Sequence, residues 1–287
     1  MRHLQTYRLF ESSRSLSGKQ RKFLDKYTKG VWTFNPKTGE VDIDGDFDCS
    51  VSRLQSFGGI KFGEISGSFK CTRNSITSLE GCPHTVGADF ECGVNPIKSL
   101  KGGPKTVGGT FSCQNSSSLT SVFGAPETVG RSFLCLLNSV KSLEGLPGNM
   151  SVGTGFNCSY NYLTSLVGVP KIIGGDFICI KNDLANLEGA PQTVGGEFSS
   201  DGLKIPEGEW SMDTLIGIFL DGTPQQKHLV APLVDPKVIQ QQIDENPEGM
   251  LVKLKGVLKH PHLRGLKWPE RLEQEKDLLS DLGDVGL

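Results

Sequence analysis

Residues 90–110 read FECGVNPIKSLKGGPKTVGGT, and Phe111 begins the same phrase again. The phrase opens with Phe-x-Cys, places an Asn three residues after the Cys, and places an aliphatic residue two positions further on. The Phe recurs at intervals of 21 to 23 residues, at Phe47, Phe69, Phe90, Phe111, Phe133, Phe156, Phe177 and Phe198. A period this regular predicts a solenoid, in which each coil packs only against its neighbours.

Each coil is expected to contain one short strand. Phe and Cys two residues apart share a face of that strand, so one face is buried and the other is open. The structural Asn row is predicted to satisfy backbone groups inside the turn that follows the strand, and consists of Asn74, Asn95, Asn138, Asn161 and Asn182. Pro104 and Gly108, with their equivalents in other coils, predict an extended return path and a tight turn into the next strand.

This pattern resembles the leucine-rich repeat, with Phe and Cys standing for Leu in Leu-x-Leu-x-x-Asn-x-Leu, over residues 41–206. The short units with a Pro on the return are similar to the bacterial and phage members. The opening residues 1–11, MRHLQTYRLFE, resemble those of repeat proteins predicted in T4-like marine bacteriophages. The resemblance implies a right-handed parallel β solenoid with an extended, non-helical convex side, whose concave sheet binds proteins.

Three parts are expected along the chain: an N-terminal arm and helical cap in residues 1–40, a solenoid of about eight units in 41–206, and a small helical C-terminal domain with an acidic tail in 207–287. The cap helix is predicted over Ser17–Lys29. Four C-terminal helices are predicted to start at Ser211, Thr223, Asp235 and Asn246.

Composition favours no general affinity for nucleic acid or membrane, because the net charge is −2 and no apolar run reaches the length of a signal peptide or a membrane span. The basic residues of the cap helix are interpreted as a solvated face. Contact with nucleic acid or membrane through them is the alternative; they are Lys19, Arg21, Lys22, Lys26 and Lys29.

Cysteine usage favours free thiols in a reducing cytoplasm, the host cytoplasm if the chain is phage-encoded. Seven of the eight Cys occupy one equivalent core position, so they are packing residues first, with disulfides or zinc as alternatives. Cys82 lies off this row, on the return path, and is expected to be the most reactive thiol.

No catalytic motif is found, and neither a cofactor nor a metal is predicted. The last Cys is Cys179, which excludes a thiol nucleophile in the C-terminal region. His260 and His262, separated by a Pro, are interpreted as no metal site. An enzyme acting through the C-terminal helices is the least favoured reading.

Strand positions that alternate with Phe and Cys must face outward, and their character changes along the array. Asp46, Asp48, Asp89 and Glu91 predict a solvated acidic surface on the early coils. The predicted partner-binding residues lie on later coils: Leu134, Leu136, Leu137, Asn157, Ser159, Tyr160, Ile178 and Ile180. Exposed aliphatic residues often mark an interaction site, although the C-terminal helices or a dimer partner are alternative explanations.

The sequence therefore favours a non-catalytic recognition module that binds a protein or peptide on its sheet. The alternative is a structural component of a virion or scaffold. The sequence does not distinguish a monomer from a dimer.

Overall fold

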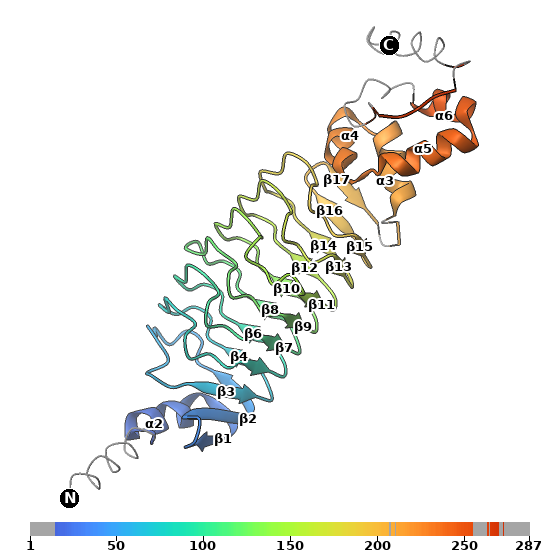
Figure 1. Cartoon of the computed structure of the whole chain (residues 1–287). Coiled ribbons are helices and arrows are strands. Elements are labelled where there is room, and N and C mark those ends of the chain that lie inside the picture. The colour runs from blue at the N-terminus through green and yellow to red at the C-terminus, as the bar shows by residue number, and fades with distance from the viewer. Residues whose placement is uncertain are drawn as a thin grey trace, which may run out of the picture.

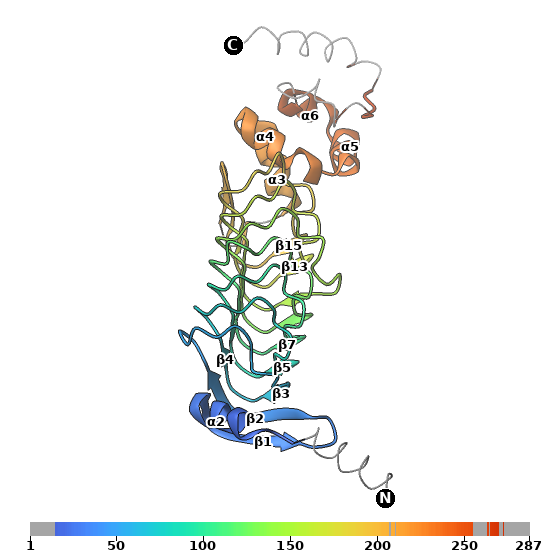
Figure 2. The same ribbon diagram turned by 90° about the vertical axis from the view of Figure 1, so that its left-hand side faces the viewer.

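The computed structural model describes residues 15–206, 208–209, 211–254, 263, 265–269 and 272. Its main body is a parallel β solenoid of about eight coils, one for each repeated Phe. The coils stack into a long, nearly straight column, and neither view shows a pronounced concave side (Figures 1 and 2).

The first set of strands begins at the repeated Phe and is called the Phe ladder. Neighbouring strands are parallel and pair Phe with Phe, as in Phe133 with Phe156. The ladder consists of β2 (Glu40–Asp48), β4 (Phe69–Lys70), β6 (Phe90–Glu91), β8 (Phe111–Ser112), β10 (Phe133–Leu134), β12 (Phe156–Asn157), β14 (Phe177–Ile178) and β16 (Phe198–Ser200).

A second set of parallel strands lies on the return path, where the sequence predicted only an extended segment. This Thr-Val ladder consists of β3 (Phe62–Ile65), β5 (Thr85–Val86), β7 (Thr106–Val107), β9 (Thr128–Val129), β11 (Ser151–Val152), β13 (Ile172–Ile173) and β15 (Thr193–Val194). Strand β2 is long enough to start both ladders, since it pairs with β3 and with β4.

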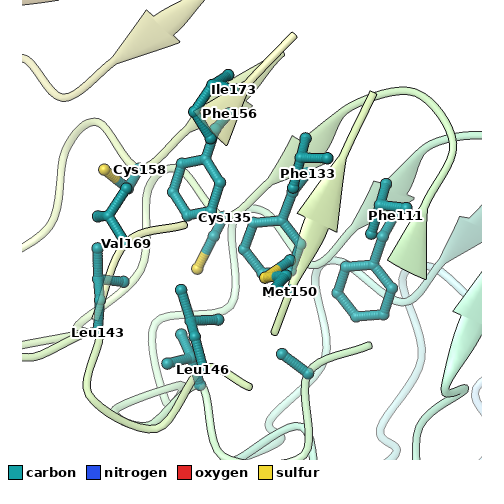
Figure 3. Close-up of a cluster of buried hydrophobic side chains, with 14 of the residues drawn as sticks. Phe111, Phe133, Cys135, Leu143, Leu146, Met150, Phe156, Cys158, Val169 and Ile173 are labelled. Atoms are coloured by element: carbon teal, nitrogen blue, oxygen red, sulfur yellow. The ribbon is translucent and has the colours of Figure 1, made fainter. Parts of the chain in front are cut away.

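The core is a continuous stack of side chains from all coils. The Phe of each coil and the Cys of the first seven are fully buried, and the aliphatic residues of the return path pack opposite them. Most successive Phe rings stack along the column, as Figure 3 shows for Phe111 and Phe133, whose centroids are 5.3 Å apart. The centroids of Phe90 and Phe111 are 5.2 Å apart. Each ring thus buries its faces against the rings of adjacent coils, which no single coil could achieve alone.

The glycine that follows each Thr-Val pair has a different role from the one predicted. Gly108 and Gly153 do not adopt positive φ angles, so no left-handed turn requires them. A Cβ atom on Gly153 would instead lie 2.1 Å from the carbonyl oxygen of Gly130 in the preceding coil. Glycine is needed here because the backbones of adjacent coils approach too closely for any side chain.

At the N-terminal end, helix α2 (Gly18–Tyr27) begins with a capping box between Ser17 and Gln20. The helix runs directly into β1 (Thr28–Asn35), which pairs with β2 in antiparallel orientation, so it ends earlier than Lys29. The rings of Phe23 and Tyr27 lie 5.9 and 6.1 Å from that of Phe47 and cover the first coil.

At the C-terminal end, β17 (Leu203–Ile205) turns back at Asp201–Gly202 to pair with β16 in antiparallel orientation, which ends the parallel array. Four helices then begin at the predicted caps: α3 (Met212–Asp221), α4 (Pro224–Val230), α5 (Pro236–Glu245) and α6 (Pro247–Leu254). A short 3₁₀ helix that was not predicted, η1 (Ala231–Leu233), follows α4 directly. The Leu187 N–H donates to the Leu229 carbonyl at 3.0 Å, which ties these helices to the last coils. Among the described helices, none has the length and apolar character needed to cross a bilayer.

Candidate functional site

The outer surface of the Phe ladder is the candidate site. Its side chains are in register from coil to coil, so that Leu134 lies beside Asn157 and Asn157 beside Ile178. Position 136 is aligned with 159 and 180 in the same way, because Leu137 N donates to Ser159 O and Tyr160 N donates to Ile180 O. The predicted partner-binding residues are therefore brought together on three consecutive coils.

Six of these residues form a patch on that surface, which we call the aliphatic patch: Leu134, Leu136, Leu137, Tyr160, Ile178 and Ile180. Leu137 and Tyr160 are 43% and 47% exposed, and the other four are half-buried. The described C-terminal helices stack on the end of the column and do not extend along this surface (Figure 1). They leave the patch accessible to solvent.

The turn beneath the patch is organised by the Asn row. Asn161 donates from Nδ2 to the carbonyls of Cys135 (2.8 Å) and Cys158 (3.1 Å), and its Oδ1 accepts from the Val140 N–H (3.1 Å). One amide thus joins two coils. The same two-coil bridge is made by Asn74, Asn95 and Asn182.

The residue before each Asn adopts a left-handed backbone conformation. Leu137 and Tyr160 have φ angles of 58° and 55°, and Val94 has 56° although β-branched residues rarely adopt this region. The conformation recurs in coil after coil, so it belongs to the repeat and does not mark one site. Its consequence is that the side chain at this position points outward, which explains the exposure of Leu137 and Tyr160.

Two polar residues, Asn157 and Ser159, lie between the aliphatic members of the patch. Asn157 Oδ1 accepts from the Ser159 N–H at 3.0 Å, and the Asn157 side chain is half-buried. Ser159 is only 2% exposed, and its hydroxyl has no hydrogen-bond partner among the described residues. The sequence placed Ser159 on an open surface, but the structure shows it sunk below its neighbours.

On the acidic surface predicted for the early coils, two partly exposed carboxylates also have a structural role. Asp46 Oδ1 accepts from the Ser68 N–H at 2.7 Å, and Asp89 Oδ1 accepts from the Thr110 N–H at 2.8 Å. This backbone hydrogen bond, assisted by Arg131, lowers the pKa of Asp89. Asp46 and Asp89 therefore hold adjacent coils together, whereas Asp48 Oδ1 accepts from the Ser50 N–H within its own coil.

Lys70 and Glu91 neutralise each other on the same early coils. Lys70 Nζ and Glu91 Oε1 are 2.7 Å apart, and this hydrogen bond raises the pKa of Lys70. Asp46 and Asp48 have no ion pair among the described residues, so the early coils keep an acidic character beside this neutralised pair.

Cys82, which was predicted to be the most reactive thiol, is the most exposed of the eight Cys, since the other seven are 0% exposed, but its setting does not activate it. Cys82 is only 8% exposed because the return path packs its side chain inward, and burial raises the pKa of its thiol well above the usual value. All eight Cys are free and buried. A nucleophilic thiolate needs an exposed or electropositive setting, which Cys82 lacks.

Two further candidates from the sequence are the basic residues of the cap helix and the pair His260 and His262. On α2 and β1, Arg21 lies over the Trp32 ring and Lys26 over the Tyr27 ring, so part of the basic surface is engaged with aromatic rings. His260 and His262 lie outside the described residues. Within the described ranges, no group of His, Cys, Asp or Glu is arranged to hold a metal ion.

Comparison of the chain with models of protein families, with curated proteins and with solved structures found no match, so its fold class rests on its own repeat and geometry.

Proposed function

We propose that the protein is a non-catalytic recognition module that binds a peptide or protein segment on the outer surface of the Phe ladder. The aliphatic patch carries this proposal, because the fold does not need apolar side chains at outward positions. Equivalent positions in the preceding coil hold Ser112, Gln114 and Asn115 in the same backbone geometry. Apolar residues placed on a surface without a packing role favour an interface.

The dimensions of the patch favour a short segment as the partner. Three coils at about 4.8 Å per strand span only about 10 Å between the outer two, whereas a standard protein interface covers roughly 800 Å² on each partner. An extended peptide or a protruding loop therefore suits the patch better than a broad domain surface.

We further infer that the chain is a leucine-rich-repeat-like protein of the phage type that acts in a reducing cytoplasm. The spacing of the Phe-x-Cys-x-x-Asn phrase supports the resemblance to leucine-rich repeats. The opening residues of the chain, 1–11, support the resemblance to the phage proteins. The eight free thiols support the compartment.

A matched pair of substitutions tests the proposed site. Leu137 and Val94 occupy the same position of the repeat, have φ angles of 58° and 56°, and are both 43% exposed. Peptides are first selected on the wild-type chain from a random display library and then titrated against Leu137→Asp and Val94→Asp. We expect Leu137→Asp to abolish binding and Val94→Asp to preserve it.

Equal affinity of both variants would contradict the aliphatic patch as the site. Circular dichroism and thermal melting of the two variants show whether either loss comes from unfolding. Because the two exchanges have matched backbone geometry and exposure, any unfolding cost of an Asp at this position should be similar in both.

A second candidate function is that of a structural part of a larger assembly. Phe123 and Ile172 are 60% and 65% exposed and lie away from the Phe ladder, on the return path and the Thr-Val ladder. If the chain is a structural component, Phe123→Ser with Ile172→Thr should prevent its incorporation into purified particles. Peptide binding by the same variant should be unchanged.

A further inference from the structure

We propose that Asn157 and Ser159 form a polar track across the aliphatic patch, which hydrogen-bonds an extended peptide carrying acceptors two residues apart. The inference rests on the proposed function, since it names the chemistry by which the same patch would recognise its peptide. Its evidence is the hydrogen bonds of these two residues, together with two groups that have no partner among the described residues: the Ser159 hydroxyl and the Asn157 NH₂.

Ser159 has one unused group, its hydroxyl. The Ser159 N–H donates to Asn157 Oδ1, and its carbonyl accepts from Leu137 N at 3.0 Å and from Asn161 Nδ2 at 3.2 Å. Its Oγ has no partner within the described part of the chain although the residue is 98% buried, being 2% exposed. A buried hydroxyl without a partner lowers stability, so such a group calls for an explanation outside folding.

Asn157 supplies the second unused group. Its Oδ1 accepts a hydrogen bond from the Ser159 N–H. If the amide were flipped, its NH₂ would face that N–H, and two donors would oppose each other. The amide NH₂ is therefore fixed in direction, and in the described residues no acceptor takes it. Asn157 is half-buried, so this donor is accessible from outside.

The placement of the two groups fits an extended chain. Asn157 and Ser159 are alternate residues, and groups on one side of an extended chain repeat about every 6.6–6.8 Å. Leu134 and Leu136 flank the track from the preceding coil, and Ile178 and Ile180 from the following coil. A peptide between these aliphatic residues would run along β12 and present side chains i and i+2 to the two donors, shielded from water.

A second copy of the chain fits the track less well. Identical surfaces meet in a two-fold dimer, so the side-chain acceptors that the track of a second copy offers to the Asn157 NH₂ are the recessed Ser159 hydroxyl and the already bonded Asn157 Oδ1. A peptide with acceptor side chains, such as Asn, Asp, Ser or Thr at i and i+2, satisfies both groups at once. Reaching Ser159 Oγ requires rotamer changes of neighbouring side chains, which are common on binding.

The test uses the folded full chain and a fluorescein-labelled copy of a peptide selected on it from a random display library. Ser159→Ala is compared with Ser200→Ala, because the Ser200 hydroxyl is also buried and has no partner among the described residues but occupies the inward, Cys-equivalent position. We expect the melting temperature of each variant to equal or exceed that of wild type. Only Ser159→Ala should weaken Kd, by about fivefold, as one net hydrogen bond implies.

Asn157→Asp is the second variant, since it keeps the Oδ1 acceptor for the Ser159 N–H and replaces the NH₂ donor with a negative oxygen. We expect it to weaken Kd by about tenfold or more, because a lost bond is replaced by repulsion of the acceptor. The peptide sequences selected on wild type should be enriched in acceptor side chains two residues apart, and those selected on Asn157→Asp should lose this preference.

The outcomes separate the two proposals. Unchanged Kd in both Ser159→Ala and Asn157→Asp, with binding lost in Leu137→Asp, would overturn the polar track and leave the proposed function standing. Binding retained in Leu137→Asp would overturn both. Dimerisation of wild type in light scattering, lost in Leu137→Asp and blocked by no selected peptide, would assign the patch to a second copy and also overturn the track.

Discussion

Individual side chains join each coil to the backbone of the next. Some of them are Asp residues, each paired with a Gly one coil later, and this pairing is visible in the sequence. Asp89 bonds to the Thr110 N–H, and a Cβ on Gly109 would lie 2.3 Å from that carboxylate. Every Asp just before a repeated Phe is followed one coil later by such a Gly: Asp46 with Gly67, Asp89 with Gly109, and Asp176 with Gly196. This correlation could have shown that these carboxylates are structural.

The Asn row gives a graded prediction. Asn161 bridges two coils through Cys135 and Cys158, whereas Asn138 donates only to Cys135 of its own coil and accepts from Ser116 N. Each buried backbone group left without a partner costs about 1–3 kcal/mol. We expect Asn161→Ala to lower the free energy of unfolding by about 3 kcal/mol or more, and Asn138→Ala to lower it by about 1 kcal/mol less, measured by urea denaturation.

Asn149→Ala is the control, because Asn149 is exposed and lies outside the row. Its stability should stay within about 0.5 kcal/mol of wild type, as for most surface substitutions. Equal losses for Asn161→Ala and Asn138→Ala would contradict the importance of the second bridge.

Among the elements, the Phe ladder could be predicted from the sequence and the Thr-Val ladder could not. A Phe-x-Cys pair followed by an Asn is a repeated signal over six residues, and it gives the strand, the buried face and the turn together. Most strands of the second ladder are only two residues long. They lie between a Pro and a Gly, and this local sequence also fits a turn. Its pairing depends on the neighbouring coil, which local sequence does not display.

The second ladder leads to a prediction about Gly153. An added methyl group would lie 2.1 Å from the Gly130 carbonyl oxygen, so the coils must move apart there. We expect Gly153→Ala to destabilise the protein by about 2 kcal/mol or more, as overpacked sites do. Gly148→Ala, five residues earlier, is the control, since no atom lies within 4 Å of its Cβ position. Equal melting temperatures of the two variants would contradict the close approach.

For the whole molecule, the sequence predicted which side chains face outward but not what covers them. The outward orientation of Leu134 and Ile178 follows from their alternation with the buried Phe and Cys alone. The burial of Ser159 depends on larger residues at the same position of adjacent coils, and the accessibility of the patch depends on where the C-terminal helices stack. Cys82 lies off the Cys row and is the most exposed of the eight thiols, but its position on the return path still packs into the shared core.

The Cys column that runs the length of that core makes stability depend on pH. Burial raises the pKa of Cys49 to about 12, and it raises the pKa of Cys71, Cys92 and Cys158 as well. In the unfolded chain the pKa of a Cys thiol is about 8.5. Below that pH both states hold the proton and stability is unaffected. Between about pH 8.5 and 12 only the unfolded chain releases it, so each thiol lowers stability by up to about 1.4 kcal/mol per pH unit.

We therefore expect the free energy of unfolding, measured in denaturant with a reductant, to fall steeply from pH 8.5 to 10. In Cys49→Ala the slope should be shallower by about 1 kcal/mol per pH unit, whatever constant loss the cavity causes. Val86→Ala, which also opens a cavity at a fully buried position, should lower stability equally at every pH and keep the wild-type slope. Identical slopes in Cys49→Ala and Val86→Ala would show that the thiol ionises as readily in the folded core as in the unfolded chain, contrary to its burial.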